Sequence, residues 1–553
     1  MKNKKRLQVV AAVTALLMGC SILTACQNSE QQTSSDGTEG KTEVVENSEV
    51  ADEGNEIIEV TSVRTLDSTL QFAEGEDINN NKWTQSLLDE YGIKVNYKWT
   101  VPSDQFSEKR SLMLSTGDIP DFFYLDSTGF EQAVASDMLY DLSEVYEEYA
   151  SDALKERMNI DANTLTAGTV DGKLYALPQA GDQLTNDIMV LWIRQDWLDN
   201  LGLEVPTTVD EMIAVAEAFK NNDPDGNGED DTVGIGFSYN SGLCYKGLLY
   251  AMGAYPDIWL EDESGSLVSG TIQPEMKTAL EKVQEIYKKG LIETEFYVKN
   301  YANYQEDLGS GRIGMTIDNY VTPLSFSGSW DVDKNANWIC CPLPGATEAD
   351  YPAVSAIGNS YTQYWVVSKD CEHPEAMIQI MNHFVDKQTN DYSFIYDSEN
   401  RSIWEYTPAT MHTPNNNLIN QRAIAEALDK GSSDGLPVQA VSNYDSVMNH
   451  QNGSTDPTEY ALTLIFGKES GLAMIDETYI TPGKYVQDAF YGASTETMVK
   501  ASATLSDLEL QVFTNIVLGE SADAFDTFVE DWKATGGEQI TTEVNEWYES
   551  NKN

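Results

Sequence analysis

Apolar residues near the start of the folded sequence follow two different periods. Some short segments alternate apolar and polar residues or are apolar throughout, as strands do. Between them lie segments whose apolar positions recur every three or four residues, as in helices. The expected strands are Ile57–Arg64, Ile93–Trp99 and Asp121–Leu125, and the expected helices are Lys82–Tyr91 and Gln105–Ser115. This alternation predicts a parallel sheet covered by helices. Ligands bind such sheets beyond the carboxyl ends of the strands, which points to Thr65–Ser68 and Asp126–Thr128 and makes Asp126 a candidate ligand residue.

A second group of elements follows a turn at Asp171-Gly172. We expect a short strand that Pro178 stops, since proline punctuates regular structure. A strand over Ile188–Arg194 and a helix over Val209–Lys220, capped by Thr207 or Thr208, come next.

The first 25 residues have the composition of a secretory signal. Basic residues at Lys2, Lys4, Lys5 and Arg6 precede an apolar run from Leu7 to Leu17 that is too short to favour a membrane span. Leu23-Thr24-Ala25-Cys26 resembles the lipobox of bacterial lipoproteins, and Leu17-Met18-Gly19-Cys20 is a weaker candidate for the same cut. The resemblance implies cleavage before Cys26 and lipidation of its thiol, hence a lipid-anchored protein outside the cell membrane.

Residues 26–56 contain almost no large apolar side chains, so they predict a disordered acidic tether. Without the signal the chain carries 30 Lys and Arg against 90 Asp and Glu. A surface of this charge repels nucleic acid and anionic lipid. Hydrophobic residues make up 41% of the 553 residues, which is enough for two or more lobes with their own cores.

Several ordered blocks carry a more specific resemblance. DGKLYALP, WIRQDWLDNLGLEVPTTVDEM and AFKNNDPDGNGEDDTVGIG resemble the family 1 extracellular solute-binding proteins of bacterial ABC importers. The nearest branch is that of the large oligosaccharide-binding lipoproteins, which includes relatives of alginate-binding proteins. The segment FVEDWKATGGEQITTEVNEWY resembles the terminal helix of that branch. The likeness extends from about residue 57 to the end of the chain.

The resemblance implies an α/β, two-lobed periplasmic-binding-protein-like fold of class II, in which each lobe is a sheet flanked by helices and the lobes are hinged. The implied order is signal peptide 1–25, tether 26–56, first lobe 57–180, second lobe 181–357, a return to the first lobe over 358–440, and a C-terminal helical part 441–553. The crossings between lobes are expected near Pro178–Ile188, near Gly358–Val367, and somewhere between Leu436 and Pro482.

The acidic loop from Asp223 to Asp231 has the spacing of a calcium loop. Oxygen ligands at alternate positions can surround one ion, and Gly228 supplies the bend. The candidate ligands are Asp223, Asp225, Asn227, the carbonyl group of Glu229, and Asp231. An EF-hand has a bidentate Glu at position 12, where this chain has Gly234, and relatives often carry an acid where this chain has Thr232. We therefore expect a structural Ca²⁺ site of uncertain affinity, with a solvated acidic turn as the alternative.

Sugars bind by stacking on aromatic rings while planar polar groups bond their hydroxyls. The candidate platforms are Tyr239, Tyr245, Trp259, Tyr320, Trp330, Trp365 and Trp404, although each ring taken alone is more often part of a core. Asp318 resembles part of a loop that enters the cleft in this family. Arg401, beside Trp404, could hold the carboxylate of an acidic sugar.

Patterns typical of enzymes are missing from the sequence. The four His residues show no metal spacing, and no HExxH, GxSxG or phosphate-binding glycine loop occurs. Cys244, Cys340, Cys341 and Cys371 are too scattered for a disulfide framework, although one disulfide stays open as an alternative.

The resemblance, together with these observations, implies a monomeric receptor, not an enzyme, that captures an oligosaccharide between two lobes and delivers it to the two permease subunits of an ABC importer. A receptor for peptide or another polar solute is the first alternative. A secreted glycan-active enzyme and a non-transport adhesin or sensor are the others.

Overall fold

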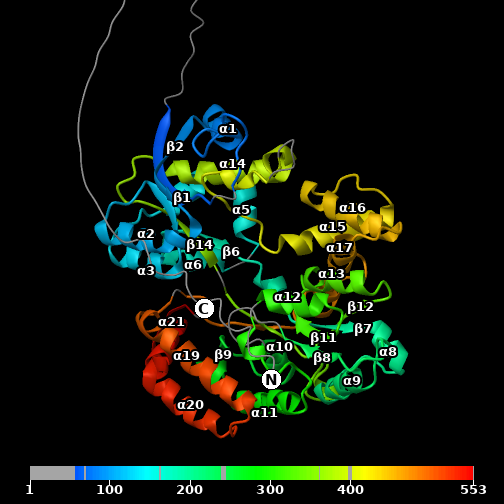
Figure 1. Cartoon of the computed structure of the whole chain (residues 1–553). Coiled ribbons are helices and arrows are strands. Elements are labelled where there is room, and N and C mark those ends of the chain that lie inside the picture. Colours follow the sequence, from blue (N-terminus) through cyan, green and yellow to red (C-terminus); the bar gives the residue numbers. More distant parts are fainter. Residues whose placement is uncertain are drawn as a thin grey trace, which may run out of the picture. The chain divides into compact units, whose positions relative to one another are not determined.

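Two groups of strands organise the chain (Figure 1). The computed structural model describes residues 57–67, 70–160, 163–237, 245–299, 301–359, 361–396, 402–492 and 494–551. The predicted signal, the lipidation site Cys26 and the tether therefore lie outside the described residues.

The first group contains a three-stranded sheet in the order β3 (Phe122–Leu125), β14 (Tyr361–Val367), β6 (Leu177–Ala180). β14 runs antiparallel to both neighbours. Beside it, β1 (Ile58–Thr65) and β2 (Ile93–Val101) form the expected parallel pair. The Ser62 hydroxyl donates to the Phe122 carbonyl at 2.9 Å and thereby joins β1 to β3.

Two details differ from expectation. The three-stranded sheet is antiparallel and not parallel, because β14 comes from far along the chain and enters between β3 and β6 in the opposite direction to both. Pro178 lies inside β6 and does not stop a strand there. β6 is an edge strand, and proline is tolerated at an edge because its missing N–H group costs no ladder hydrogen bond there.

Alternate side chains of these strands fill two different cores. Phe122 and Trp365 enter one core, and Phe123 and Val366 enter the other. The helices of this part are α1 (Lys82–Tyr91), α2 (Ser103–Thr116), α3 (Ser127–Ala135), α4 (Ser143–Tyr149), α5 (Asp152–Met158), α6 (Thr164–Ala167) and α14 (Glu375–Asn390). A two-stranded hairpin, β4 (Thr169–Val170) with β5 (Lys173–Leu174), follows α6.

The second group is a four-stranded mixed sheet in the order β12 (Trp338–Cys341), β7 (Val190–Arg194), β11 (Ile313–Asp318), β8 (Val233–Gly236). Leu191 and Ile193 face one core, and Val190 and Trp192 face the other. Smaller pairs are β9 (Trp259–Glu261) with β10 (Leu267–Ser269) and β13 (Ala356–Ile357) with β15 (Val486–Gln487).

Helices cover both faces of this sheet. Against one face pack α9 (Val209–Asn221), α10 (Lys246–Ala251), α11 (Pro274–Lys288), α19 (Glu496–Leu518), α20 (Ala524–Trp532) and α21 (Glu538–Asn551). Against the other pack α12 (Tyr301–Gly309), α13 (Pro323–Val332), α15 (Asn416–Lys430), α16 (Val438–Gln451), α17 (Pro457–Phe466) and α18 (Gly471–Ile475). The short helices α7 (Gln183–Asn186) and α8 (Gln195–Leu201) flank β7. α9 begins at Val209, and Thr208, one of the two expected caps, is its N-cap, since its hydroxyl accepts from the Glu211 N–H.

The chain passes between the two groups of cores three times. It leaves the first group after Leu177 and joins the second at Ile188, and it returns between Ile357 and Tyr364. The third passage lies between Met411 and Leu418. This is earlier than the interval of Leu436 to Pro482 that the sequence suggested, because α15 and α16 pack on α17 in the second group.

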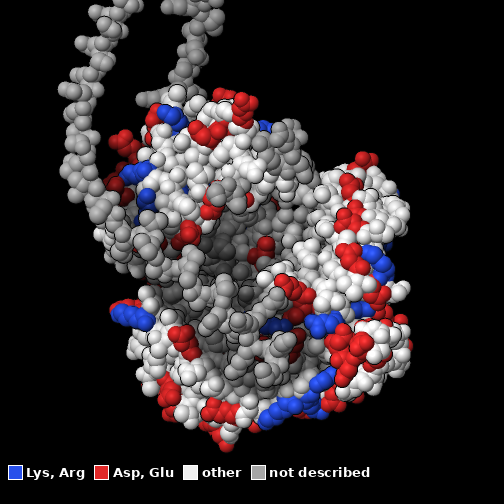
Figure 2. All heavy atoms as spheres, in the orientation of Figure 1, with Lys and Arg blue, Asp and Glu red and all other residues white. Residues whose placement is uncertain are grey.

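Acidic side chains are spread over the helices of the face drawn in Figure 2, with basic ones interspersed among them. Ion pairs such as Lys94–Glu59 and Lys430–Glu426 join exposed side chains, and such pairs contribute little to stability.

Candidate functional site

A cavity of about 730 Å³ opens where the chain passes between the two groups of cores. Nine of its 18 lining residues carry amide side chains: Gln179, Gln183, Asn186, Gln388, Asn416, Asn417, Asn420, Gln439 and Asn443. Among the described lining residues there is one carboxylate, Asp182, and no Lys or Arg. Each amide offers both donors and an acceptor, so the wall can bond many hydroxyl groups without placing net charge beside them.

Hydrogen bonds tie the three crossing segments together beside this cavity. Asp182 accepts from the backbone N–H of Asn415 at 2.5 Å, and Asp187 accepts from that of Gly358 at 3.0 Å. Burial raises the pKa of both carboxyl groups, and these backbone donors oppose the rise. Two carboxylates of the first crossing segment thus hold the other two segments.

Gln179 fixes the position of His412 within the wall. Its Oε1 accepts from the His412 N–H at 2.5 Å, and its Nε2 donates to the carbonyl groups of His412 at 3.1 Å and Ala180 at 2.9 Å. Burial, together with the Arg157 charge, lowers the pKa of His412 to about 4, so the imidazole is neutral at neutral pH.

Trp404 supplies an aromatic wall. It begins a 3-10 turn, Trp404–Tyr406, and its ring lies edge-to-face with His412 at 4.9 Å. Arg64, near the end of β1, donates to the carbonyl groups of Glu405 at 2.6 Å and Thr407 at 3.2 Å. Since these bonds hold the turn on both sides of Tyr406, the Trp404 ring is positioned before any ligand binds.

Arg157 lies behind the cavity wall and is only 9% exposed. Its Nη1 donates to the Oε1 of Gln388 and to the Met411 carbonyl, both at 2.6 Å. Because Gln388 Oε1 is used in this way, its NH₂ group is the part left for the cavity. The guanidinium group has no carboxylate partner within the described residues; burial lowers its pKa to about 10, so it stays charged at pH 7.

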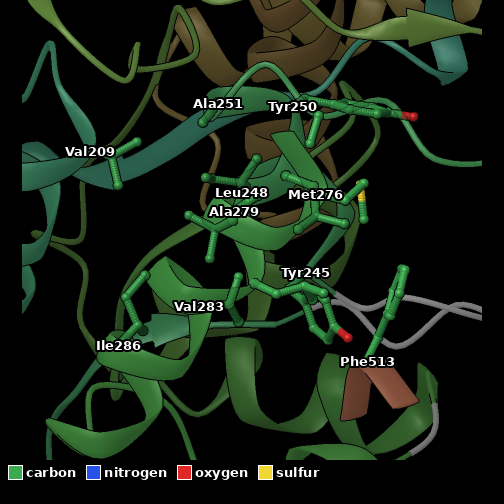
Figure 3. Packing of buried hydrophobic residues seen from close by; sticks show 14 of the residues in the cluster. Val209, Tyr245, Leu248, Tyr250, Ala251, Met276, Ala279, Val283, Ile286 and Phe513 are labelled. Atoms are coloured by element: carbon green, nitrogen blue, oxygen red, sulfur yellow. The ribbon is translucent and has the colours of Figure 1, made fainter. Parts of the chain in front are cut away.

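Four of the expected aromatic platforms are buried in cores. Tyr245 lies among Leu248, Met276 and Phe513 (Figure 3), and Trp259 belongs to the same core. Trp365 packs against Phe122, and Tyr320 belongs to the core around Trp192. Packing already occupies these rings, so the described surface offers a ligand little of them.

The other expected residues lie at separate places. Trp330 stacks on Tyr460 at 5.2 Å, with the Lys334 ammonium group over its ring. Asp318 ends β11 and accepts from the Tyr304 hydroxyl at 3.0 Å. Asp126 caps α3 and is ion-paired with Arg110.

Tyr239 and Arg401 lie outside the described residues, as does Cys244. Of the expected ligand residues that the structure describes, Trp404 alone lines the cavity.

Sequence reasoning missed the amides that dominate the wall. Asn415, Asn416 and Asn417 form a continuous polar run at the start of α15, followed one turn later by Asn420. The amide-rich first turn of an otherwise ordinary helix is the sequence signal that points to these residues, whereas aromatic residues alone do not indicate them. Asn416 Nδ2 donates to Gln439 Oε1 at 2.8 Å, so this pair joins α15 to α16 within the wall.

The acidic loop has the bend that a cation loop needs. Gly228 has φ of +81° and Asp223 has φ of +47°. Asn227 Nδ2 donates to Asp225 at 2.9 Å and to Asp231 at 3.3 Å, so the two carboxylates face one point. Partial burial raises the pKa of Asp225, and the neighbouring acids Asp223 and Asp231 raise it further.

The donor set fits a hard cation only when amide and carbonyl oxygens take part. Among the described residues, His, Cys, Asp and Glu side chains alone form no group of three or more that could hold a metal ion. Asn227 and the Glu229 carbonyl group would therefore have to complete the ligand set. For this the Asn227 amide would turn its oxygen, in place of its Nδ2, toward the two carboxylates. Asp223, Asp225 and Asp231 would neutralise the charge of the ion.

Cys340, Cys341 and Cys371 are free thiols, and burial raises the pKa of each. These thiols are therefore protonated and unreactive near neutral pH. Within the described residues, no helix combines the length and apolar character needed to cross a bilayer.

Comparisons with known proteins agree on one family. A family model described as bacterial extracellular solute-binding protein matches residues 76–390. Lipoprotein LipO of Bacillus subtilis is 24% identical over 482 residues, which cover 84% of this chain and 88% of LipO. FusA of Streptococcus pneumoniae, a fructooligosaccharide ABC transporter substrate-binding protein, is 31% identical over 246 residues, 41% of this chain and 44% of FusA.

The solved structure of FusA from S. pneumoniae in complex with kestose has the same fold. Its TM-score is 0.59 at 19% identity, and the match covers 89% of this chain and all of the FusA chain. The fold is therefore the two-lobed α/β fold of periplasmic binding proteins, with the amide-lined cavity beside the segments that join the lobes.

Proposed function

The chain belongs to the bacterial extracellular solute-binding proteins, and from that premise we propose that it captures a neutral oligosaccharide in the amide-lined cavity. As a member of this family it is the solute-binding component of an ABC importer. FusA, a relative with a described role, is the substrate-binding protein of a transporter, which favours binding over catalysis.

The chemistry of the wall carries the proposal. Nine amides, one carboxylate and the Trp404 ring match a ligand with many hydroxyl groups and apolar ring faces. The described wall has no Lys or Arg to pair with a uronate, and its single acid, Asp182, would repel one. This composition favours a neutral sugar over an acidic one, and FusA, whose ligand in the solved complex is kestose, indicates the first compound to test.

Capture would proceed by closure of the lobes around the sugar. Ligand contacts with α15 and α16 on one side and with Trp404 and Gln388 on the other stabilise the closed state relative to the open one. The carboxylates of Asp182 and Asp187 keep the crossing segments together while the lobes move. The closed monomer would then dock on two permease subunits.

Anchoring through Cys26 belongs to the same proposal. Its support is the lipobox-like sequence together with the likeness to a lipoprotein over most of the chain. Metabolic labelling with an alkynyl fatty acid should label the expressed protein, and Cys26→Ala should abolish the label. Labelling that persists in Cys26→Ala and is lost in Cys20→Ala would place the anchor at Cys20.

Calorimetric titration of the protein without residues 1–26 tests the ligand class. Kestose and a neutral trisaccharide of another linkage are compared with a trigalacturonate and a tripeptide. We expect heat with a neutral sugar and a rise in melting temperature, because a ligand that binds only the native state adds about 2.7 kcal/mol of stability at 100 times its Kd. Binding of the tripeptide alone would overturn the sugar proposal, and tight binding of the uronate would overturn neutrality.

We also propose that the loop Asp223–Asp231 holds one structural Ca²⁺. Removal of calcium with a chelator should then lower the melting temperature by several degrees, because a bound ion stabilises only the folded loop. Asp225→Asn should reduce the effect of the chelator, whereas Asp230→Asn, which changes an exposed acid that is not a proposed ligand, should leave it unchanged. An equal response to chelator in all three proteins would return the loop to an acidic turn.

A further inference from the structure

A second cavity of about 970 Å³ shares no lining residue with the amide-lined cavity. α3, α6 and the β4–β5 hairpin form one side, and residues just before α19 form the other together with the end of α21. Its apolar lining consists of Phe130, Val134, Leu165, Val170, Tyr491 and Trp547, together with two alanines. The wall therefore has the character of a site for a small organic molecule.

The electrostatics of this wall all have one sign. Glu131 and Asp171 line it, and none of the described lining residues is Lys, Arg or His. Ser550 and Asn551 bring the C-terminal end of α21 to the cavity, and a helix presents partial negative charge at that end. Each of these features attracts a positive charge.

Glu131 is the group that most requires a partner. It is half-buried beside Phe130 and Val134, and its carboxylate forms no hydrogen bond or ion pair with the described residues. Burial raises the pKa of this carboxyl group to about 7. Leaving such a carboxylate unpaired in an apolar wall is costly, and a bound cation would remove that cost.

The aromatic part of the wall is rigid. Trp547 lies edge-to-face with Phe490 at 4.8 Å and with Tyr491 at 4.7 Å. A Cβ atom at Gly492 would lie 2.6 Å from Trp547 Nε1, so this indole position depends on a glycine there. Aromatic faces next to a carboxylate are the setting in which ammonium groups bind proteins through cation–π attraction.

We propose that this cavity is a second binding site, for a small organic monocation of the alkyl- or arylammonium class, with the charged group at Glu131 and the apolar part against Trp547 and Tyr491. The site is distinct from the sugar cavity, and the proposal does not depend on which solute that cavity takes. Since one side belongs to the first lobe and the other to helices of the second, an occupant would contact both.

Calorimetric titration of the full chain with choline tests the proposal, with 3,3-dimethylbutan-1-ol as a neutral molecule of the same shape. We expect choline to bind and the alcohol to bind at least tenfold more weakly. Glu131→Gln should weaken choline binding tenfold or more, and Trp547→Leu should weaken it as well. Glu108→Gln makes the same change at an exposed position on α2 and should leave the affinity unchanged.

The opposite results would overturn the site. Equal binding of choline and the alcohol would show an apolar pocket without charge recognition. A loss in Glu108→Gln equal to that in Glu131→Gln would show general attraction to an acidic surface. Absence of choline binding in the parent protein, measured together with sugar binding in the same preparation, would overturn this proposal and leave the proposed transport function standing.

Folding of the variants has an independent check. Glu131→Gln removes an unpaired half-buried charge, so its melting temperature at pH 7.5 should equal or exceed that of the parent. Glu131 is the group of the site that titrates near pH 7. Tyr364, whose pKa the Glu131 charge also raises, has a pKa that burial raises to about 12, and Asp171 is exposed. Choline affinity should therefore rise with pH near 7 in the parent and stay constant in Glu131→Gln.

Discussion

The two cavities have similar volumes and opposite chemistry. In the cavity at the crossing segments several of the lining amides are already bonded: Gln179 to the His412 backbone, Gln388 to Arg157, and Asn416 to Gln439. The cavity next to α21 is lined by apolar side chains and carries a carboxylate with no partner. The first cavity holds these amides in fixed orientations before a ligand arrives, whereas the second leaves the Glu131 charge for a ligand to satisfy.

This difference shows how one fold can recognise two kinds of molecule. Fixed amides select a ligand by the geometry of its hydroxyl groups, because a misplaced hydroxyl leaves a buried donor or acceptor unpaired. An apolar wall whose charged groups are all acidic selects a ligand by the sign of its charge and by its size. The two sites should therefore respond to different substitutions, and exchange of the two responses would contradict the comparison.

The largest effect is expected from removing the two aromatic walls separately. Trp404→Ala should weaken binding of the neutral oligosaccharide by about 2–3 kcal/mol, or roughly 30- to 150-fold, because a buried aromatic anchor is lost. Choline binding should not change in this variant. Trp547→Leu should weaken choline binding and leave sugar binding unchanged. Calorimetric titration of both variants with both ligands gives the four affinities.

Trp330→Ala is the matched control for the first of these changes. Trp330 is a half-exposed tryptophan of the second lobe that stacks on Tyr460 away from both cavities. Its loss can lower the melting temperature but should leave both affinities within twofold. A sugar affinity that falls as far in Trp330→Ala as in Trp404→Ala would place the sugar elsewhere.

A smaller effect, about tenfold in sugar affinity, is expected from Arg157→Gln. Arg157 acts through Gln388, because its bond to Oε1 determines that the NH₂ group of Gln388 is left for the cavity. Arg157→Lys should restore part of the affinity, since an ammonium group can also donate to Oε1.

A double-mutant cycle with Gln388→Ala separates this role from general stability. If Arg157 acts by orienting Gln388, then Arg157→Gln should change the sugar affinity little once Gln388 is alanine. Additive losses in affinity would show that Arg157 contributes by another route, such as through the Met411 carbonyl group.

Local elements could be read from the sequence because local physics determines them. Lys82–Tyr91 forms the helix expected, with Asn81 as its N-cap and Gly92 at φ of +67° as its C-cap. The parallel pairing of β1 with β2 follows from the helix between them. The antiparallel entry of β14 could not be read, because its partners β3 and β6 are more than 180 residues away.

The candidate site was only partly predictable for a related reason. Trp404 and Trp365 look alike in sequence, since both are aromatic residues outside amphipathic helices. Only tertiary packing distinguishes them: Trp365 is 5% exposed within the core of the first lobe, whereas Trp404 lies on a turn held by Arg64, which is more than 340 residues earlier in the sequence than the carbonyl groups it binds. The amides of α15 reach the wall only because the third crossing falls between Met411 and Leu418.

The smallest effect expected is a difference in how the ligand affinities of the two sites change with pH. Between pH 7.5 and pH 6.5, a carboxyl group with a pKa of about 7 goes from about three-quarters to about one-quarter ionised, so choline affinity should fall about threefold. Sugar affinity should change less than twofold, because the pKa of His412 is about 4 and its imidazole remains neutral throughout.

Titrations at the two pH values, repeated with Glu131→Gln, measure both trends. The sign follows from the charged form: the cation binds ionised Glu131, so protonation competes with it. A choline affinity that rises on acidification, or a threefold fall that persists in Glu131→Gln, would remove Glu131 from the site and with it the contrast between the two cavities.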